Sequence, residues 1–146
     1  MHKKQVIVLD SNEIIFGLLG RNNFCRILID NLYKFKEFYD FKINGQIFSE
    51  VSRNIPKDAE RKFIALLRLN IIKFDKDIID ASLIEKYKKL CLKKGDIIIA
   101  AYADKVEADC IISENRHFLK ELKTKQFKIR NAEDFIKDNI SYSKGA

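Results

Sequence analysis

Residues 6–12 have the sequence VIVLDSN, in which a short run of four apolar residues stops abruptly at Asp10. Three of the four are β-branched, which is typical of a strand buried on both faces in a parallel sheet. Ser11 and Asn12 are residue types that cap helices, so we expect a short helix over about residues 13–20. This unit places a carboxylate just beyond the carboxyl end of a strand, where open parallel sheets bind their ligands.

The same alternation of short apolar strands and amphipathic helices continues along the chain. Further strands are expected over 42–43, 71–74, 110–112 and 127–129, and further helices over 22–39, 46–55, 58–69, 77–92, 95–106, 117–122 and 132–137. The pattern predicts an α/β fold, a three-layer α/β/α sandwich with a mostly parallel sheet of four to five strands. We expect one domain over residues 1–138 and a loose tail over 139–146.

Composition supports a globular domain and excludes several classes of protein. The chain has 146 residues, 47% of them hydrophobic, with five glycines and one proline. Those values argue against disordered, collagenous and turn-dense β proteins. No apolar run approaches the roughly 18 residues of a membrane span, and only four apolar residues follow the basic start, too few for a signal peptide. We therefore expect a cytoplasmic protein that has no membrane partner.

Three cysteines and two histidines offer no spacing typical of a zinc site. Cys25, Cys91 and Cys110 are far apart in sequence, as are His2 and His117. We expect the cysteines to behave as small buried apolar residues in a reducing compartment.

Three acidic residues stand out because of the elements on which they are expected to lie. Asp10 follows the first strand, Glu50 lies on a middle helix, and Asp96 opens an otherwise apolar helix. Each has an ordinary explanation, since Asp caps helices and Glu is common on solvated helix faces.

Taken together, four segments of the chain resemble the PIN domain family. The segments are DSN (10–12), SEV (49–51), GDIIIAAYA (95–103) and ADCIISENRHFL (108–119). Their order and spacing fit the family from Val6 to about Ile136. PIN domains are the ribonuclease fold of VapC-type toxins and of several RNA-processing nucleases, so the resemblance implies a PIN-like sheet and a nuclease.

The resemblance also implies a metal site. At the positions that match the family motif, Asp10, Glu50 and Asp96 would be the catalytic acids and would hold Mg²⁺ or Mn²⁺. These hard cations prefer oxygen ligands, and clustered carboxylates repel one another unless a cation is bound.

The turn after the fourth strand departs from the family. Asn115 stands where relatives carry an aspartate, so Asn115 itself or the neighbouring Glu114 is the candidate for the missing ligand. Asn12 and Ser113 match polar positions that support the acids. Asp109, at the start of its strand, is interpreted as a structural cap.

Basic residues flank the predicted acidic pocket in sequence. The formal net charge is +7, from 28 Lys and Arg against 21 Asp and Glu. Lys93 and Lys94 precede Asp96, and Arg116 follows Asn115, so these three are the candidates for RNA phosphate contacts. The alternative is a solvated helix face.

The sequence therefore predicts a metal-dependent endoribonuclease acting on RNA. The resemblance implies the toxin of a toxin–antitoxin pair, with an antitoxin protein as partner and a homodimer as assembly. One alternative is a catalytically weakened PIN domain that binds RNA, because Asn115 replaces an acid. A second is a phosphoryl-aspartate phosphatase or receiver, in which an aspartate also ends the first strand, although the DSN segment lacks the second aspartate of the phosphatase motif.

Overall fold

A five-stranded sheet forms the centre of the computed structural model, which describes residues 3–76, 78–90 and 93–144, with the side chains of 117, 121 and 140–144 left aside. All neighbouring strands are parallel and follow the order β3-β2-β1-β4-β5. The strands are β1 (Gln5–Leu9), β2 (Tyr39–Asn44), β3 (Ile72–Asp75), β4 (Cys110–Ile112) and β5 (Lys128–Arg130). The predicted α/β class with a parallel sheet is confirmed.

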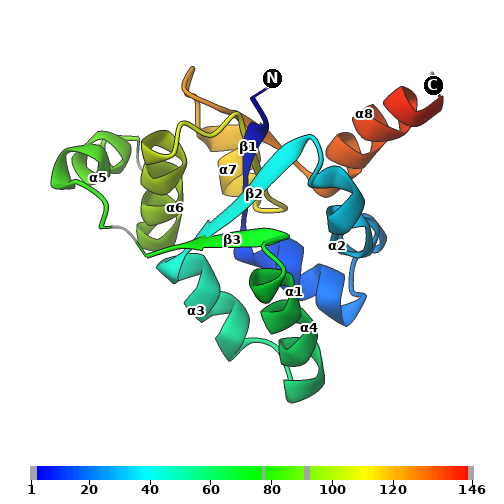
Figure 1. Ribbon diagram of the computed structural model, residues 1–146. Helices are drawn as coiled ribbons and strands as arrows, with labels where there is room; N and C mark the ends of the chain where they lie inside the picture. Colours follow the sequence, from blue (N-terminus) through cyan, green and yellow to red (C-terminus); the bar gives the residue numbers. More distant parts are fainter. Residues whose placement is uncertain (1–2, 77, 91–92, 145–146) are drawn as a thin grey trace.

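Helices cover both faces of this sheet. They are α1 (Ser11–Leu19), α2 (Asn23–Phe35), α3 (Gly45–Arg53), α4 (Lys57–Arg68), α5 (Ala81–Lys88), α6 (Lys94–Lys105), α7 (Arg116–Glu121) and α8 (Ala132–Lys144). In Figure 1, α5 and α6 lie on one side of the sheet and α2 and α8 on the other, while α1, α3 and α4 lie toward its lower end. None of the helices in the described ranges is long and apolar enough to span a bilayer.

The strand order reverses direction at the central strand β1. From β1 the chain moves outward through β2 to β3, and then returns across the sheet to β4 and β5. Val8 pairs with Lys42 of β2 on one side and with Ile111 of β4 on the other, and its side chain is fully buried. The gap between the carboxyl ends of β1 and β4 is therefore the topological switch point, where ligands of such sheets bind.

The element boundaries differ from the expected ones in three places. Residue Tyr39, expected at a helix end, begins β2, and its ring packs 5.1 Å from that of Phe135 on α8. The expected helix over 77–92 is shorter, at Ala81–Lys88. Helix α8 continues to Lys144 rather than ending near residue 137, and Asn139, at the start of the expected tail, accepts a hydrogen bond from the Tyr39 hydroxyl at 3.1 Å. Tertiary contacts of the Tyr39 side chain account for the start of β2 at this residue and for the extension of α8. Local sequence patterns do not predict such contacts.

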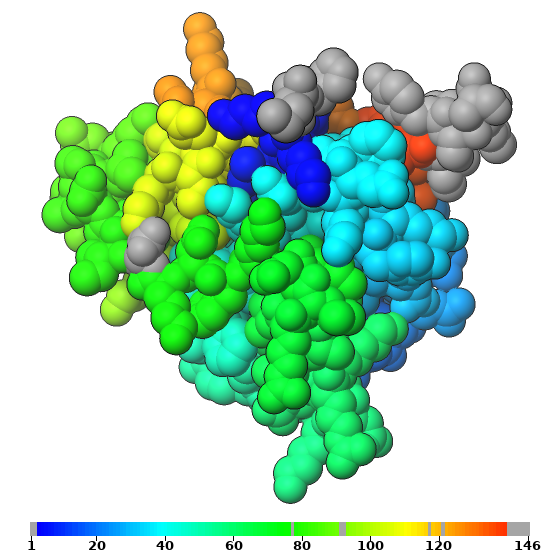
Figure 2. Space-filling view, in the orientation of Figure 1, coloured from blue at the N-terminus to red at the C-terminus, as the bar shows by residue number. Residues whose placement is uncertain are grey.

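Helices α1 and α2 approach each other closely at Gly17. A Cβ atom there would lie 2.3 Å from Ile29 Cγ1 and 2.7 Å from the carbonyl oxygen of Cys25. Figure 2 shows β3 and α4, in green, on the near face of the molecule. Helix α1 is therefore held between α2, α3 and α4, with its first turn beside the sheet.

Candidate functional site

Asp10 lies at the switch point, as the last residue before α1. Its Oδ1 accepts a hydrogen bond from the backbone N–H of Ser11 at 2.8 Å, which caps the helix. Its Oδ2 accepts one from the hydroxyl of Ser113 at 2.6 Å, and Ser113 directly follows β4. Asp10 is 5% exposed and Ser113 fully buried, so the two strand ends are joined by a buried polar contact.

Glu50 reaches the same place from α3. The hydroxyl of Ser11 donates to Glu50 Oε2 at 2.6 Å, and Gln46 Nε2 donates to Glu50 Oε1 at 2.7 Å. A Cβ atom on Gly95 would lie 3.5 Å from Glu50 Oε1. The first turn of α6 therefore packs against the Glu50 carboxylate, which brings the next acid close.

Asp96, on that first turn of α6, is almost fully buried. The side-chain amide of Asn115 donates to Asp96 Oδ1 at 3.1 Å, and the backbone N–H of Asn115 donates to Ser113 Oγ at 3.0 Å. Hydrogen bonds thus run from Glu50 through Ser11, Asp10, Ser113 and Asn115 to Asp96. The three predicted acids, the predicted support Ser113 and the possible ligand Asn115 belong to this network, together with Ser11, which was not among the predicted site residues. We call the three acids, Asp10, Glu50 and Asp96, the acid cluster.

Negative charge dominates the acid cluster. The pKa of Asp10 is raised from its ordinary 3.8 to about 6, first by burial and further by the charges of Glu50 and Asp96, against the opposing hydrogen bonds from Ser113 and Ser11. Among the described side chains, no lysine or arginine forms an ion pair with Asp10 or Glu50. All of the donor atoms are oxygens, a set that fits a hard divalent cation such as Mg²⁺ or Mn²⁺.

The remaining predicted ligands and supports lie in different environments. Asn12 is half-buried on the first turn of α1, next to the acid cluster in sequence. Glu114 turns elsewhere: its Oε1 accepts from the thiol of Cys25 on α2 at 3.7 Å, and its carboxylate accepts from the backbone N–H of Ala132. Asp109 lies at the opposite edge of the sheet, where its Oδ2 accepts from the backbone N–H of Val6 at 2.7 Å.

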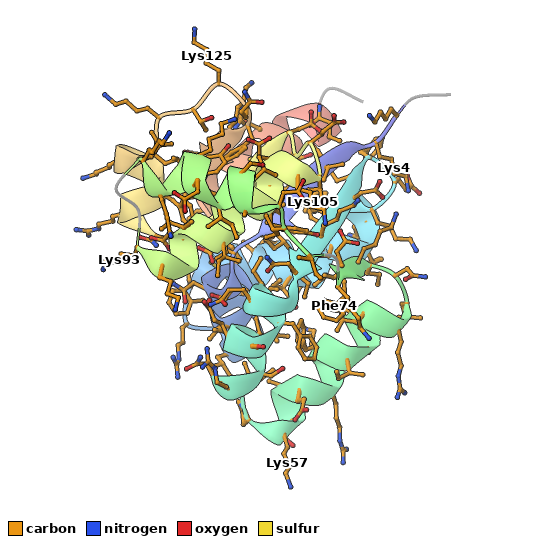
Figure 3. The ribbon with its side chains drawn as sticks, turned by 90° about the vertical axis from the view of Figure 1, so that its left-hand side faces the viewer. Lys4, Lys57, Phe74, Lys93, Lys105 and Lys125 are labelled. Carbon is orange, nitrogen blue, oxygen red and sulfur yellow. The ribbon has the colours of Figure 1, made fainter. Side chains whose placement is uncertain are left out.

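The predicted RNA-contacting residues are all exposed, and each lies at a helix start. Lys93 is the N-cap residue of α6, Lys94 its first residue, and Arg116 the first residue of α7. Figure 3 shows Lys93 projecting from the start of α6 and Lys125 at the far upper end of the molecule. Lys128, at the start of β5, pairs with Cys110 at the beginning of β4 and so lies toward the edge of the sheet away from the acid cluster.

A second cluster went unnoticed in the sequence. Glu13 on α1, Cys25 on α2 and Glu114 offer ligand atoms that lie within 4.8 Å of one another, and we call them the thiol cluster. Burial is the largest cause that raises the pKa of all three groups, followed for Glu13 by the charge of Glu114. The sequence signal for this cluster was Glu13, an acid in the largely apolar helix α1. Acidic residues are also common in the first turn of helices because of the helix dipole, so this signal alone does not indicate a ligand.

Comparison with known proteins finds similarity in fold but none in sequence. No protein-family model matches the chain, and no curated protein matches it by sequence. Its fold is similar to that of a chain in the crystal structure of VapBC2 from Rickettsia felis bound to a DNA fragment from their promoter. The two chains are 17% identical with a TM-score of 0.61, and the match covers 87% of this chain and 98% of that chain. This likeness concerns the fold and agrees with the PIN-like sheet that the sequence predicts.

Proposed function

We propose that this protein is a PIN-type endoribonuclease that depends on Mg²⁺ or Mn²⁺. The observation that carries the proposal is the acid cluster: three carboxylates, from the N-cap of α1, from α3 and from α6, are separated by 40 and 46 residues in sequence and meet in one hydrogen-bonded network at the switch point. A buried concentration of like charge is unfavourable by itself, and a bound cation removes that cost.

The fold relative supports the more specific role of a VapC-type toxin. Its name, VapBC2, agrees with the VapC-type family that the sequence resembles. In this role the chain acts in the cytoplasm, forms a homodimer and is held inactive by an antitoxin protein. Co-purification with the product of an adjacent small reading frame tests the antitoxin partner, and sedimentation of the purified chain tests the dimer.

Asp10, Glu50 and Asp96 would hold the cation, with Asn115 offering a neutral oxygen beside them. A bound Mg²⁺ or Mn²⁺ supplies an acidified water and neutralises charge on the scissile phosphate. Ser113 and Ser11 orient the Asp10 and Glu50 carboxylates through hydrogen bonds of 2.6 Å each. Lys93, Lys94 and Arg116 would bind phosphates of the RNA on either side.

Cleavage of single-stranded RNA by purified protein tests the proposal. Asp10→Asn and Asp96→Asn should each lower the Mg²⁺-dependent rate by about 10³-fold, corresponding to roughly 4 kcal/mol of transition-state stabilisation. Asp109→Asn is the matched control, because this acid lies at the other edge of the sheet. Full activity in either cluster variant, or cleavage that survives EDTA, contradicts the proposal.

RNA binding is tested separately with the Asp10→Asn variant, so that no RNA is cut. Affinity should fall steeply between low and physiological salt, because phosphate contacts release counterions. Lys94→Glu and Arg116→Glu should weaken binding further, whereas Lys125→Glu, well apart from Lys93 at the top of Figure 3, should have a smaller effect. Equal losses from all three changes would mean that net charge alone governs binding.

One observation favours a second candidate, an RNA-binding PIN domain with weakened catalysis. The amide of Asn115 donates to Asp96, a contact that a carboxylate at the same position could not make. In this case the wild-type chain binds RNA with the same salt dependence but cuts no faster than Asp10→Asn.

A further inference from the structure

The thiol cluster joins three segments that are distant in sequence. Glu13 lies on the first turn of α1, Cys25 on the first turn of α2, and Glu114 in the turn after β4. The Cys25 sulfur lies 3.1 Å from Glu13 Oε2 and 3.7 Å from Glu114 Oε1. One potential ligand atom from each of the three side chains therefore lies within 4.8 Å of the other two.

Glu13 is unusual within this cluster because it is fully buried and incompletely satisfied. Its exposed fraction is 0%, and among the described residues its Oε1 has no hydrogen-bond partner. No described lysine or arginine forms an ion pair with Glu13 or Glu114. A buried carboxylate oxygen without a partner is unfavourable, and a cation bound there would remove that cost.

We propose that Glu13, Cys25 and Glu114 form a second metal site, which binds a thiolate-preferring divalent cation of the Zn²⁺ type. Zinc–sulfur bonds of about 2.3 Å and zinc–oxygen bonds of about 2.0–2.2 Å in a tetrahedral site separate S and O by about 3.5 Å. The two observed S···O distances lie on either side of that value. A water molecule completes the four ligands.

This site differs from the acid cluster in its donor chemistry. Sulfur is a poor ligand for Mg²⁺ and Mn²⁺ and a good one for Zn²⁺, whereas the acid cluster offers oxygen only. The cation would connect α1, α2 and the turn that carries Ser113 and Asn115, the residues that link Asp10 to Asp96. It is therefore a structural cation that holds the turn of the acid cluster in place.

Titration with Co²⁺, a spectroscopic substitute for Zn²⁺, tests the site. The purified protein is first freed of metal and then supplied with excess Mg²⁺. It should bind Co²⁺ with a thiolate-to-metal charge-transfer band in the near ultraviolet, and added Zn²⁺ should abolish that band. Cys25→Ser should remove it, while Cys110→Ser and Cys91→Ser should keep it. Glu13→Gln should weaken Co²⁺ binding by about tenfold or more, because affinity depends on ligand charge.

The controls separate this site from the proposed nuclease. Asp96→Asn, which lacks an acid-cluster ligand, should keep the charge-transfer band and its Co²⁺ affinity, so the result does not depend on RNA cleavage. If Cys25→Ser fails to fold by circular dichroism, Glu13→Gln still decides, because all three thiols remain in it. The absence of the band in the wild type, its persistence in folded Cys25→Ser, or unchanged affinity in Glu13→Gln each overturns the proposal.

Discussion

Asp10 and Glu13 lie one helical turn apart at the start of α1, yet their surroundings are opposite in character. Asp10 faces the gap between β1 and β4 and receives hydrogen bonds from a backbone N–H and a serine hydroxyl. Glu13 faces α2, where its Oε2 accepts a hydrogen bond from the thiol of Cys25 and its Oε1 has no hydrogen-bond partner among the described residues. One turn of helix thus contributes carboxylates to two clusters of different chemistry.

The comparison shows that the position of an acid relative to the sheet, and not its type, determines its chemistry. The acid cluster forms at the carboxyl edge because parallel strands end there and helices begin there. The thiol cluster forms where α1 and α2 cross, and this crossing depends on the missing side chain of Gly17. The four predictions that follow perturb one cluster at a time and are ordered by expected effect.

The largest effect should come from Gly17→Ala, which separates α1 from α2. The new Cβ would meet Ile29 Cγ1 at 2.3 Å and the Cys25 carbonyl oxygen at 2.7 Å, so the helices must move apart. We expect a loss of about 3 kcal/mol in the free energy of unfolding, measured by urea denaturation. Gly45→Ala is the control, because nothing lies within 4 Å of its new Cβ, and stability there should be unchanged or raised by up to about 1 kcal/mol. Equal stabilities for the two variants would mean that the crossing does not depend on Gly17.

Ser113→Ala should disturb the acid cluster instead. The lost hydroxyl donates to a buried carboxylate and accepts from the Asn115 N–H, so we expect a loss of about 2 kcal/mol near pH 8. The loss should shrink near pH 4, where Asp10 is protonated and no longer needs the donor. The exposed Ser49 on α3 is the control, and Ser49→Ala should change stability by less than about 0.5 kcal/mol. A loss independent of pH would indicate that only packing was removed.

The acid cluster was accessible from sequence because strand ends and helix starts are local features. VIVL followed by Asp10, and GD followed by IIIAA, indicate a strand end and a helix start, and the resemblance to the PIN family then singled out these two acids together with Glu50. The thiol cluster was not accessible, because the contact of Cys25 with Glu13 depends on how two helices pack. The direction of Glu114 depends on the start of α8, whose first backbone N–H it accepts from. Such side-chain directions follow from tertiary packing and leave no periodic signal.

Asp10→Asn should stabilise the protein when no metal is present. The pKa of Asp10 is about 6 in the folded state against 3.8 ordinarily, so its contribution to stability is complete below about pH 3.8 and is lost as the pH rises through 6. At 1.36 kcal/mol per pKa unit, the free energy of unfolding falls by about 3 kcal/mol when Asp10 ionises. The neutral side-chain amide of the Asp10→Asn variant avoids this loss, but it gives up part of the hydrogen bonding that the carboxylate makes. We expect a net gain of about 1–2 kcal/mol at pH 8 in EDTA and none at pH 4. A gain of the same size at both values would exclude charge burial as its cause.

The smallest effect on stability, and the sharpest distinction between the clusters, should come from Asn115→Asp. In the metal-free protein the new carboxylate replaces an amide that donates to Asp96 Oδ1 at 3.1 Å, so a hydrogen bond becomes a repulsion and stability should fall by about 1 kcal/mol. With Mg²⁺ present the new carboxylate becomes favourable, because it adds a charged ligand. It should lower the Mg²⁺ concentration for half-maximal RNA cleavage by about tenfold. Asn70→Asp, an exposed change remote from the site, controls for net charge and should alter neither quantity. If stability falls while the Mg²⁺ requirement stays the same, Asn115 only positions Asp96. The cation is then held by Asp10, Glu50 and Asp96 without any contribution from the turn after β4.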